Sequence, residues 1–187
     1  MRFRQCAADS LPFEDNSFDT VICRLGAMFF PDPLVALREI TSSKPGGAIS
    51  LAVWHKSEVN PFLDRVTDVI NRYVETPPAD PDAPGAFRFA EPGKLAGVLT
   101  NAGASDVSER LLEFRMEAPV SAEEFWILRS EISETLREKL KRLTADQAIR
   151  VSKEVQEAVR EFFPNDKMTF PAQMIIVTGT KYNAAET

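Results

Sequence analysis

The sequence predicts an α/β fold that contains a pair of parallel strands, and three observations support this prediction. Residues 18–23 and 48–54 are short apolar runs of the kind found in buried strands, and an amphipathic helical segment lies between them. The chain has 187 residues, of which 44% are hydrophobic and 27% charged, so it can bury an apolar core. We therefore predict a βαβ unit near the N-terminus and a single domain over residues 1–187.

The βαβ unit begins with a turn at residues 14–17 and a strand over Phe18–Cys23. Asp32 and Pro33 then open a helix, because aspartate can accept hydrogen bonds from the free amides of the first turn and proline fits the first helical position. The proline and two glycines at residues 45–47 end this helix. Its apolar face is formed by Leu34, Leu37 and Ile40.

The second strand of the unit covers residues 48–54. Ile49, Leu51 and Val53 share one face, whereas the other face carries the small residues Ala48, Ser50 and Ala52. The absence of charge on either face predicts that both faces are covered, as in a parallel sheet between helices.

The rest of the chain alternates between helical and extended patterns. Asn60 and Pro61 lead into a helix, the proline-rich residues 76–85 form a loop, and residues 91–101 form a second helix. Strands are predicted over residues 105–116 and 168–180, and a frayed tail over residues 183–187. Residues 121–163 form a helical cap or lid segment, whose apolar stripe is interpreted as core packing. The stripe consists of Phe125, Leu128, Ile132, Leu136, Leu140 and Leu143.

Charge and composition exclude several kinds of partner. The net charge of −6 offers no basic surface for nucleic acid or for an acidic membrane. No apolar run is long enough to cross a bilayer, and the N-terminus has no signal-peptide core, so a cytoplasmic location is predicted. Cys6 and Cys23 lack metal-ligand spacing and are interpreted as buried thiols, with no metal site.

Four short motifs resemble those of class I S-adenosylmethionine-dependent methyltransferases of the small-molecule "type 11" group. They are Leu-Pro-Phe-x-Asp-x-Ser-Phe-Asp at residues 11–19, Phe-Phe-Pro-Asp at 29–32, Ala-Leu-Arg-Glu at 36–39 and Lys-Pro-Gly-Gly at 44–47. The resemblance implies the third to seventh strands of a Rossmann-like methyltransferase sheet, with Arg2–Cys6 as the third and an antiparallel last strand. It also implies S-adenosylmethionine as cofactor and a small-molecule methyl acceptor as substrate.

The resemblance also assigns candidate site residues. Backbone groups of Ala7 and Ala8 match the segment that lies near the adenine of the cofactor, where Asp9 is the nearest acidic residue. Arg24 and Leu25 match the segment that lies near the methionine part of the cofactor. The only histidine, His55, is a candidate general base, since its ordinary pKa suits proton transfer. A surface or loop role for this lone histidine is the alternative. The expected walls of the acceptor pocket are Met28, Phe29 and Trp54, with ordinary core packing as the alternative for the phenylalanine.

Two parts of the family pattern have no counterpart in this sequence. None of the eight glycines forms the glycine-rich turn that follows the family's first strand, and Ala7 stands where the family has an acid for the adenine. Without the first strand, residues 18–23 become an open edge, which predicts a homodimer through this edge or coverage of it by Arg2–Cys6.

The sequence thus predicts a methyltransferase whose N-terminal strands are missing from this chain, and which is inactive alone. The alternative is a non-catalytic oligomeric or binding protein derived from the same fold.

Overall fold

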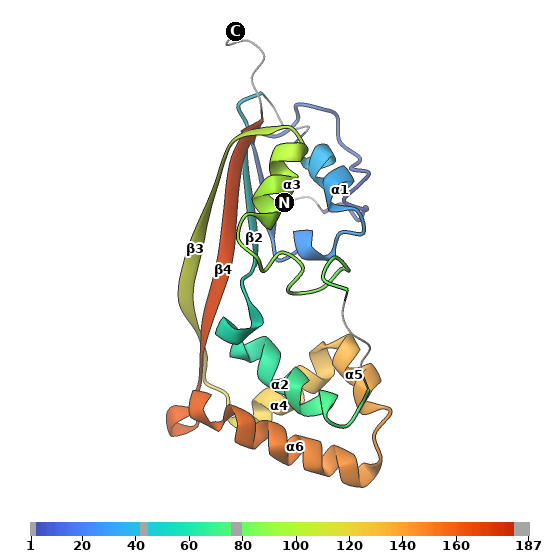
Figure 1. Cartoon of the computed structure of the whole chain (residues 1–187), viewed down its shortest axis with the longest axis vertical. Coiled ribbons are helices and arrows are strands. Elements are labelled where there is room, and N and C mark those ends of the chain that lie inside the picture. Colours follow the sequence, from blue (N-terminus) through green and yellow to red (C-terminus); the bar gives the residue numbers. More distant parts are fainter. Residues whose placement is uncertain (1–2, 42–44, 76–79, 182–187) are drawn as a thin grey trace. The chain divides into compact units, whose positions relative to one another are not determined.

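The computed structural model describes residues 3–41, 45–75 and 80–181 (Figure 1). Unless a residue is said to lie outside these ranges, the statements below refer to them. The four strands are β1 (Thr20–Arg24), β2 (Ala48–Trp54), β3 (Ala104–Ala118) and β4 (Met168–Lys181). The helices are α1 (Pro33–Ile40), α2 (Pro61–Asn71), α3 (Lys94–Asn101), α4 (Ala122–Ile132), α5 (Glu134–Leu140) and α6 (Ala145–Val159), with short 3-10 turns η1 (Ala27–Phe29), η2 (Ser57–Val59), η3 (Arg160–Phe162) and η4 (Pro164–Asp166). The α/β class predicted from the sequence is confirmed.

The four strands form one sheet in the order β1-β2-β4-β3. β1 runs parallel to β2 with Val21 opposite Ile49, and β4 runs antiparallel to β2 with Leu51 opposite Val177. The predicted βαβ unit and the predicted antiparallel last strand are therefore both present. Since β1 is the first strand in this order, its other edge has no neighbour among the described strands.

Only one face of the parallel strands is fully covered. Ile49, Leu51 and Val53 are almost completely buried, whereas Ala48 on the other face is exposed and Ser50 and Ala52 are half-buried. Figure 1 shows α1 and α3 beside the sheet, and their apolar residues Leu37, Leu95 and Leu99 are fully buried. The prediction that both faces are covered is wrong, because no described helix covers the face with the small side chains.

The ends of α1 and α3 follow from local chemistry. The carboxylate of Asp32 accepts hydrogen bonds from the amides of Leu34 and Val35, both at 3.0 Å, which confirms the predicted cap. The helix predicted from residue 91 begins only at Lys94, because Gly93 adopts the left-handed conformation with a φ of 82°.

The strand predicted over Arg2–Cys6 is wrong for residues 3–6, and Arg2 lies outside the described residues. A strand needs a neighbour to satisfy its backbone groups, and no described strand pairs with residues 3–6. These residues therefore do not cover the edge of β1. The tail predicted over 183–187 and part of the predicted loop, residues 76–79, also lie outside the described residues.

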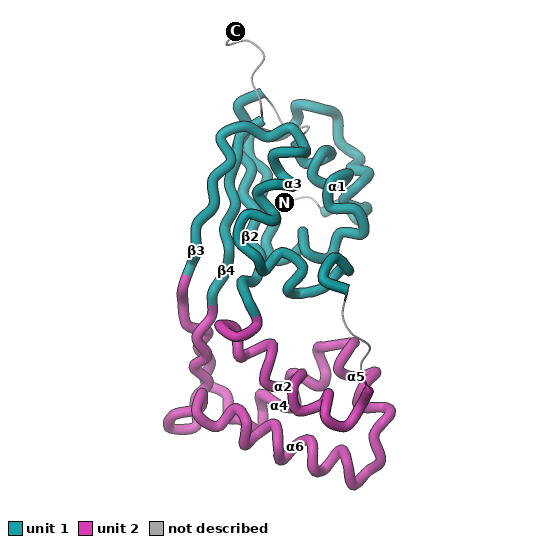
Figure 2. Tube along the Cα trace, viewed as in Figure 1, with its two compact units in different colours: residues 1–56, 80–112, 173–187 teal, residues 57–79, 113–172 magenta. Residues whose placement is uncertain are grey.

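The chain divides into two compact units (Figure 2). The first contains residues 1–56, 80–112 and 173–187, and the second contains residues 57–79 and 113–172. The helical segment predicted over 121–163 lies within the second unit. The single-domain organisation over 1–187 stays a prediction.

The second unit has its own aromatic and aliphatic core. Phe125 and Phe170 lie at its centre with ring centroids 5.3 Å apart, and α6 adds Val151, Val155 and Val159, which are fully buried. The predicted single stripe is wrong in part, since Leu128 and Ile132 are exposed. α4 ends at Ile132, and Ser133 takes an extended conformation and caps α5. The apolar residues of the two helices therefore do not form one continuous stripe.

No helix in the described part of the chain is both long enough and apolar enough to cross a membrane.

Candidate functional site

The carboxyl ends of β1 and β2 meet at one edge of the sheet. The parallel register places Arg24 opposite Ala52, so residues 24–26 leave β1 close to where Trp54 and His55 leave β2. In open α/β sheets ligands bind beyond the carboxyl ends of the strands. Four of the predicted site residues therefore share this edge: Arg24, Leu25, Trp54 and His55.

The turn after β1 is held in an unusual backbone conformation. Leu25 has a φ of 56°, in the left-handed region that residues other than glycine rarely adopt. Its amide donates a hydrogen bond to the carbonyl of Ala52 at 2.8 Å. The next residue, Gly26, is enclosed, because a Cβ added there would lie 2.9 Å from the Sγ atom of Cys23. Backbone strain of this kind is concentrated at functional sites.

The two thiols have different surroundings, and neither is fully buried as predicted. Cys6 is exposed, because the segment that carries it forms no strand. Cys23 is half-buried next to the Leu25 turn, where burial raises its pKa and hydrogen bonds from the amides of Gly26 and Ala27 offset part of that rise. Its thiol is therefore protonated at neutral pH and is a poor nucleophile.

The predicted walls of the acceptor pocket separate into buried and exposed residues. Met28 is 1% exposed, and its carbonyl accepts a hydrogen bond from the amide of Gly85 at 3.1 Å. Phe29, which follows in the same 3-10 turn, is 54% exposed and is available for a ligand. Trp54 is largely buried at the end of β2.

His55 has a partner that sequence reasoning missed. Its Nδ1 atom lies 3.1 Å from the Oε1 atom of Gln173, and its backbone amide donates to the carbonyl of the same residue at 3.1 Å. An amide oxygen can only accept, so this pairing places the ring hydrogen on Nδ1 and the basic lone pair on Nε2. Gln173 lies 118 residues further along the chain, and no motif in the sequence marks it.

The segment matched to the adenine lies in an exposed turn. The amide of Ser10 donates to the carbonyl of Ala7 at 3.4 Å, which closes a turn that contains Ala8 and Asp9. Ala7 and Asp9 are exposed and Ala8 is half-buried. Their backbone groups are therefore largely open to solvent.

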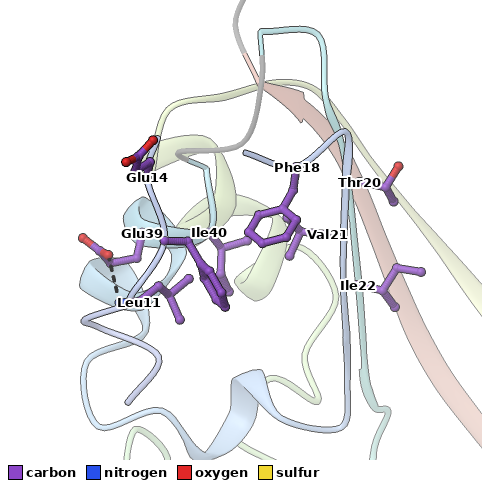
Figure 3. Close-up of a pocket in the computed structure, with 9 residues that line it drawn as sticks. Leu11, Glu14, Phe18, Thr20, Val21, Ile22, Glu39 and Ile40 are labelled. Carbon is purple, nitrogen blue, oxygen red and sulfur yellow. Dashed lines mark hydrogen bonds between the residues drawn. The ribbon is translucent and has the colours of Figure 1, made fainter. Parts of the chain in front are cut away.

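An apolar hollow of about 270 Å³ lies along the open edge of β1 (Figure 3). Figure 3 shows Phe18, Val21 and Ile40 gathered on one side of the strand, with Thr20 and Ile22 on its other side. Ile22 is 74% exposed, which is unusual for an aliphatic residue in a strand. On one flank, the amide of Leu11 donates to the carboxylate of Glu39 at 3.2 Å.

Comparison with known proteins shows similarity to methyltransferases. Residues 1–51 match a family described as "Methyltransferase domain". Over 72 residues the chain is 39% identical to the uncharacterized methyltransferase YcgJ of Bacillus subtilis, covering 38% of this chain and 28% of that protein. It is 33% identical over 114 residues to the demethylmenaquinone methyltransferase of Streptomyces griseus, covering 54% of this chain and 49% of the relative. These alignments span less than half the length of either relative.

The solved structure of Bacillus subtilis YcgJ matches the fold with a TM-score of 0.52 at 19% identity. This match covers 98% of this chain and 72% of that one. The resemblance to class I S-adenosylmethionine-dependent methyltransferases is thus confirmed, by the family match at the N-terminus and by the fold of the sheet and its helices.

Proposed function

We propose that the protein to which this chain contributes transfers a methyl group from S-adenosylmethionine to a small-molecule acceptor. The observation that carries the proposal is that the strained Leu25 turn and His55 follow the carboxyl ends of two neighbouring parallel strands, β1 and β2. The methyltransferase match over residues 1–51 supports it, because this segment includes the turn.

The residues of this chain fit only part of a cofactor site. The amide of Leu25 is already bonded to Ala52, and the proposed adenine contacts at Ala7, Ala8 and Asp9 lie in an exposed turn. None of the eight glycines belongs to a glycine-rich turn after a strand, the kind of turn that binds a phosphate or the methionine part of the cofactor. We therefore infer that the 187-residue chain alone does not hold the cofactor, and no catalytic step is derived for it.

Within the complete site, we assign the backbone of Arg24 and Leu25 to the cofactor and the side chains of Met28, Phe29 and Trp54 to the acceptor pocket. Of the pocket residues, Phe29 is best placed because of its exposure. His55 is the candidate base, since Gln173 favours the tautomer with a basic Nε2.

Calorimetric titration of the chain with S-adenosylmethionine and with S-adenosylhomocysteine tests the inference of inactivity. We expect no heat of binding at micromolar concentrations, because half of the cradle is absent. Micromolar affinity would show that this chain forms the site unaided.

The reading frame upstream of Met1 tests the proposed function itself. We expect it to encode a strand followed by a glycine-rich turn within about 70 residues, the length of two βα units. A protein that includes this segment should bind the cofactor. An in-frame stop codon next to Met1 would instead favour the non-catalytic binding protein.

We also propose that the open edge of β1 pairs with a second copy of the chain. The amide of Ala48 donates to the carbonyl of Asp19 and the amide of Leu25 to that of Ala52, so odd-numbered residues of β1 bond to β2. Because ladder bonds fall on alternate residues, the backbone groups of Thr20, Ile22 and Arg24 point outward. Antiparallel pairing centred on Ile22 would join these groups in both copies and bury the exposed isoleucine.

A cytoplasmic location remains part of the proposal. Cell fractionation followed by detection of the protein would test it.

A further inference from the structure

The second unit contains a small hollow lined by two cationic side chains. Its volume is about 90 Å³, which is room for about three water-sized groups. A carboxylate or a phosphate group is of this size. The lining residues come from α2, α4, α5 and the α4–α5 junction: Val66, Thr67, Ile70, Arg129, Ser133, Thr135, Leu136 and Lys139.

Arg129 is the central feature of this hollow. Its Nε atom is buried and has no hydrogen-bond acceptor in the described part of the chain, and its guanidinium carbon lies 4.9 Å from the centroid of the Phe62 ring. Burial lowers the pKa of Arg129, but a guanidinium stays charged at neutral pH. A buried charged donor without an acceptor is energetically costly, so an anion would relieve this state.

Lys139 adds a second positive charge to the hollow. Its ammonium donates to the Oδ1 atom of Asn71 at 2.7 Å, and burial, followed by the nearby charge of Arg142, lowers its pKa. Neither Lys139 nor Arg129 forms an ion pair with a carboxylate within the residues that the structure describes. Two half-buried cations that line one hollow without a compensating acid indicate a site for an anion.

The remaining lining residues suit a small organic anion. The Oγ atom of Ser133 accepts a hydrogen bond from the amide of Leu136 at 3.3 Å, so its hydroxyl hydrogen is directed elsewhere. Val66, Ile70 and Leu136 form an apolar wall that can hold a hydrocarbon group next to the charge.

We propose that this hollow binds the carboxylate or phosphate group of a small molecule, with Arg129 as the main ligand and Lys139 as the second. The planar guanidinium matches the two oxygens of such a group, and its hydrogen bonds to an anion are charge-assisted. This inference goes beyond the proposed methyl transfer and does not depend on it, since it concerns anion binding alone.

Titration with propionate and with inorganic phosphate at constant ionic strength, followed by amide NMR shifts, tests the proposal. We expect saturable shifts at Ser133, Thr135 and Leu136 in the millimolar range. The two probes distinguish a carboxylate from a phosphate group as the preferred ligand. Absence of saturable shifts with both probes would overturn the proposal.

The variants Arg129→Gln and Arg137→Gln form a matched pair for this experiment. Both remove one positive charge from the same unit, but Arg137 is exposed on α5 and does not line the hollow. We expect Arg129→Gln to weaken binding at least about tenfold and Arg137→Gln to leave it nearly unchanged. Equal weakening by both variants would indicate non-specific attraction and contradict the site.

Lys139→Gln provides a second variant in case Arg129→Gln does not fold, which circular dichroism would reveal. We expect it to weaken binding about threefold to tenfold, because it removes the second ligand. Unchanged affinity in Lys139→Gln would exclude the arrangement proposed here.

Discussion

At the scale of single residues, the turn after β1 shows how closely the candidate site is packed. Leu25 is held at a positive φ, and Gly26 is needed because of the neighbouring Cys23 sulfur rather than because of its own backbone angles, with a φ of −106°. Burial also raises the pKa of the same thiol, which keeps it protonated. Residues 23–26 are therefore subject to both steric and electrostatic constraints.

The first prediction concerns Gly26→Ala. The added Cβ would lie 2.9 Å from the Cys23 Sγ atom, so we expect the free energy of unfolding to fall by about 1–3 kcal/mol. Urea denaturation monitored by circular dichroism measures this change. In the Cys23→Ala background the loss should be much smaller, because the clashing atom is gone.

Gly97→Ala is the matched control for this prediction. Gly97 lies inside α3, where an added Cβ would meet nothing within 4 Å apart from the backbone of its own helix. Alanine should therefore raise the free energy of unfolding by about 0.5–1 kcal/mol. Equal destabilisation by both alanines would mean that the clash at Gly26 is not the cause.

At the scale of elements, helix ends decide how the second unit is built. The hydroxyl of Ser133 caps α5 and that of Thr144 caps α6, and in the latter the amide of Thr144 in turn donates to the side chain of Gln147. These caps fix where each helix begins and hence which side chains reach the core. The Thr144 capping box is a local feature, because its two partners lie three residues apart.

The second prediction concerns Thr144→Ala. The Oγ1 atom of Thr144 accepts from the amide of Gln147 at 3.2 Å, and the Gln147 side chain accepts from the amide of Thr144 at 2.9 Å. Loss of this cap should lower the free energy of unfolding by about 1 kcal/mol in urea denaturation. Thr144→Ser keeps the hydroxyl and should retain most of the stability, so a similar loss in both variants would contradict a capping role.

At the scale of the whole molecule, the sheet is covered unevenly. One face of β2 is buried and the other is half-open, and β1 ends the sheet with a strongly exposed Ile22. An open strand edge that carries an exposed aliphatic side chain promotes association between chains. Whether another strand pairs with the open edge of β1 therefore affects both the oligomeric state and the candidate site.

The third prediction concerns Ile22→Lys. If β1 pairs with itself across two copies, size-exclusion chromatography with light scattering should give twice the chain mass of 20.9 kDa for the natural sequence. The lysine should shift the mass to that of one chain, because like charges would lie opposite each other in the pairing. Ile149→Lys, at an exposed isoleucine on α6, should leave the mass unchanged. A natural chain that is monomeric at all concentrations would contradict the pairing.

Much of the fold could be predicted from the sequence because its signals are local. The cap at Asp32 and the alternation of Ile49, Leu51 and Val53 depend only on near neighbours in the sequence. The motifs over residues 11–47 also indicated the family resemblance that the match over residues 1–51 confirms. The incorrect strand at residues 3–6 has a different cause, since a strand is stable only beside a partner that local sequence does not reveal.

The sequence by itself thus determined the class of fold and the order of most elements. Only the tertiary structure decided that Gln173 pairs with His55, that Ile22 is exposed, and that Arg129 and Lys139 line one hollow. The physical reason is that caps and periodicity are set by near neighbours. Contacts between strands, and cations that share a hollow without an acidic partner, depend instead on segments that are distant in the sequence and meet only on folding.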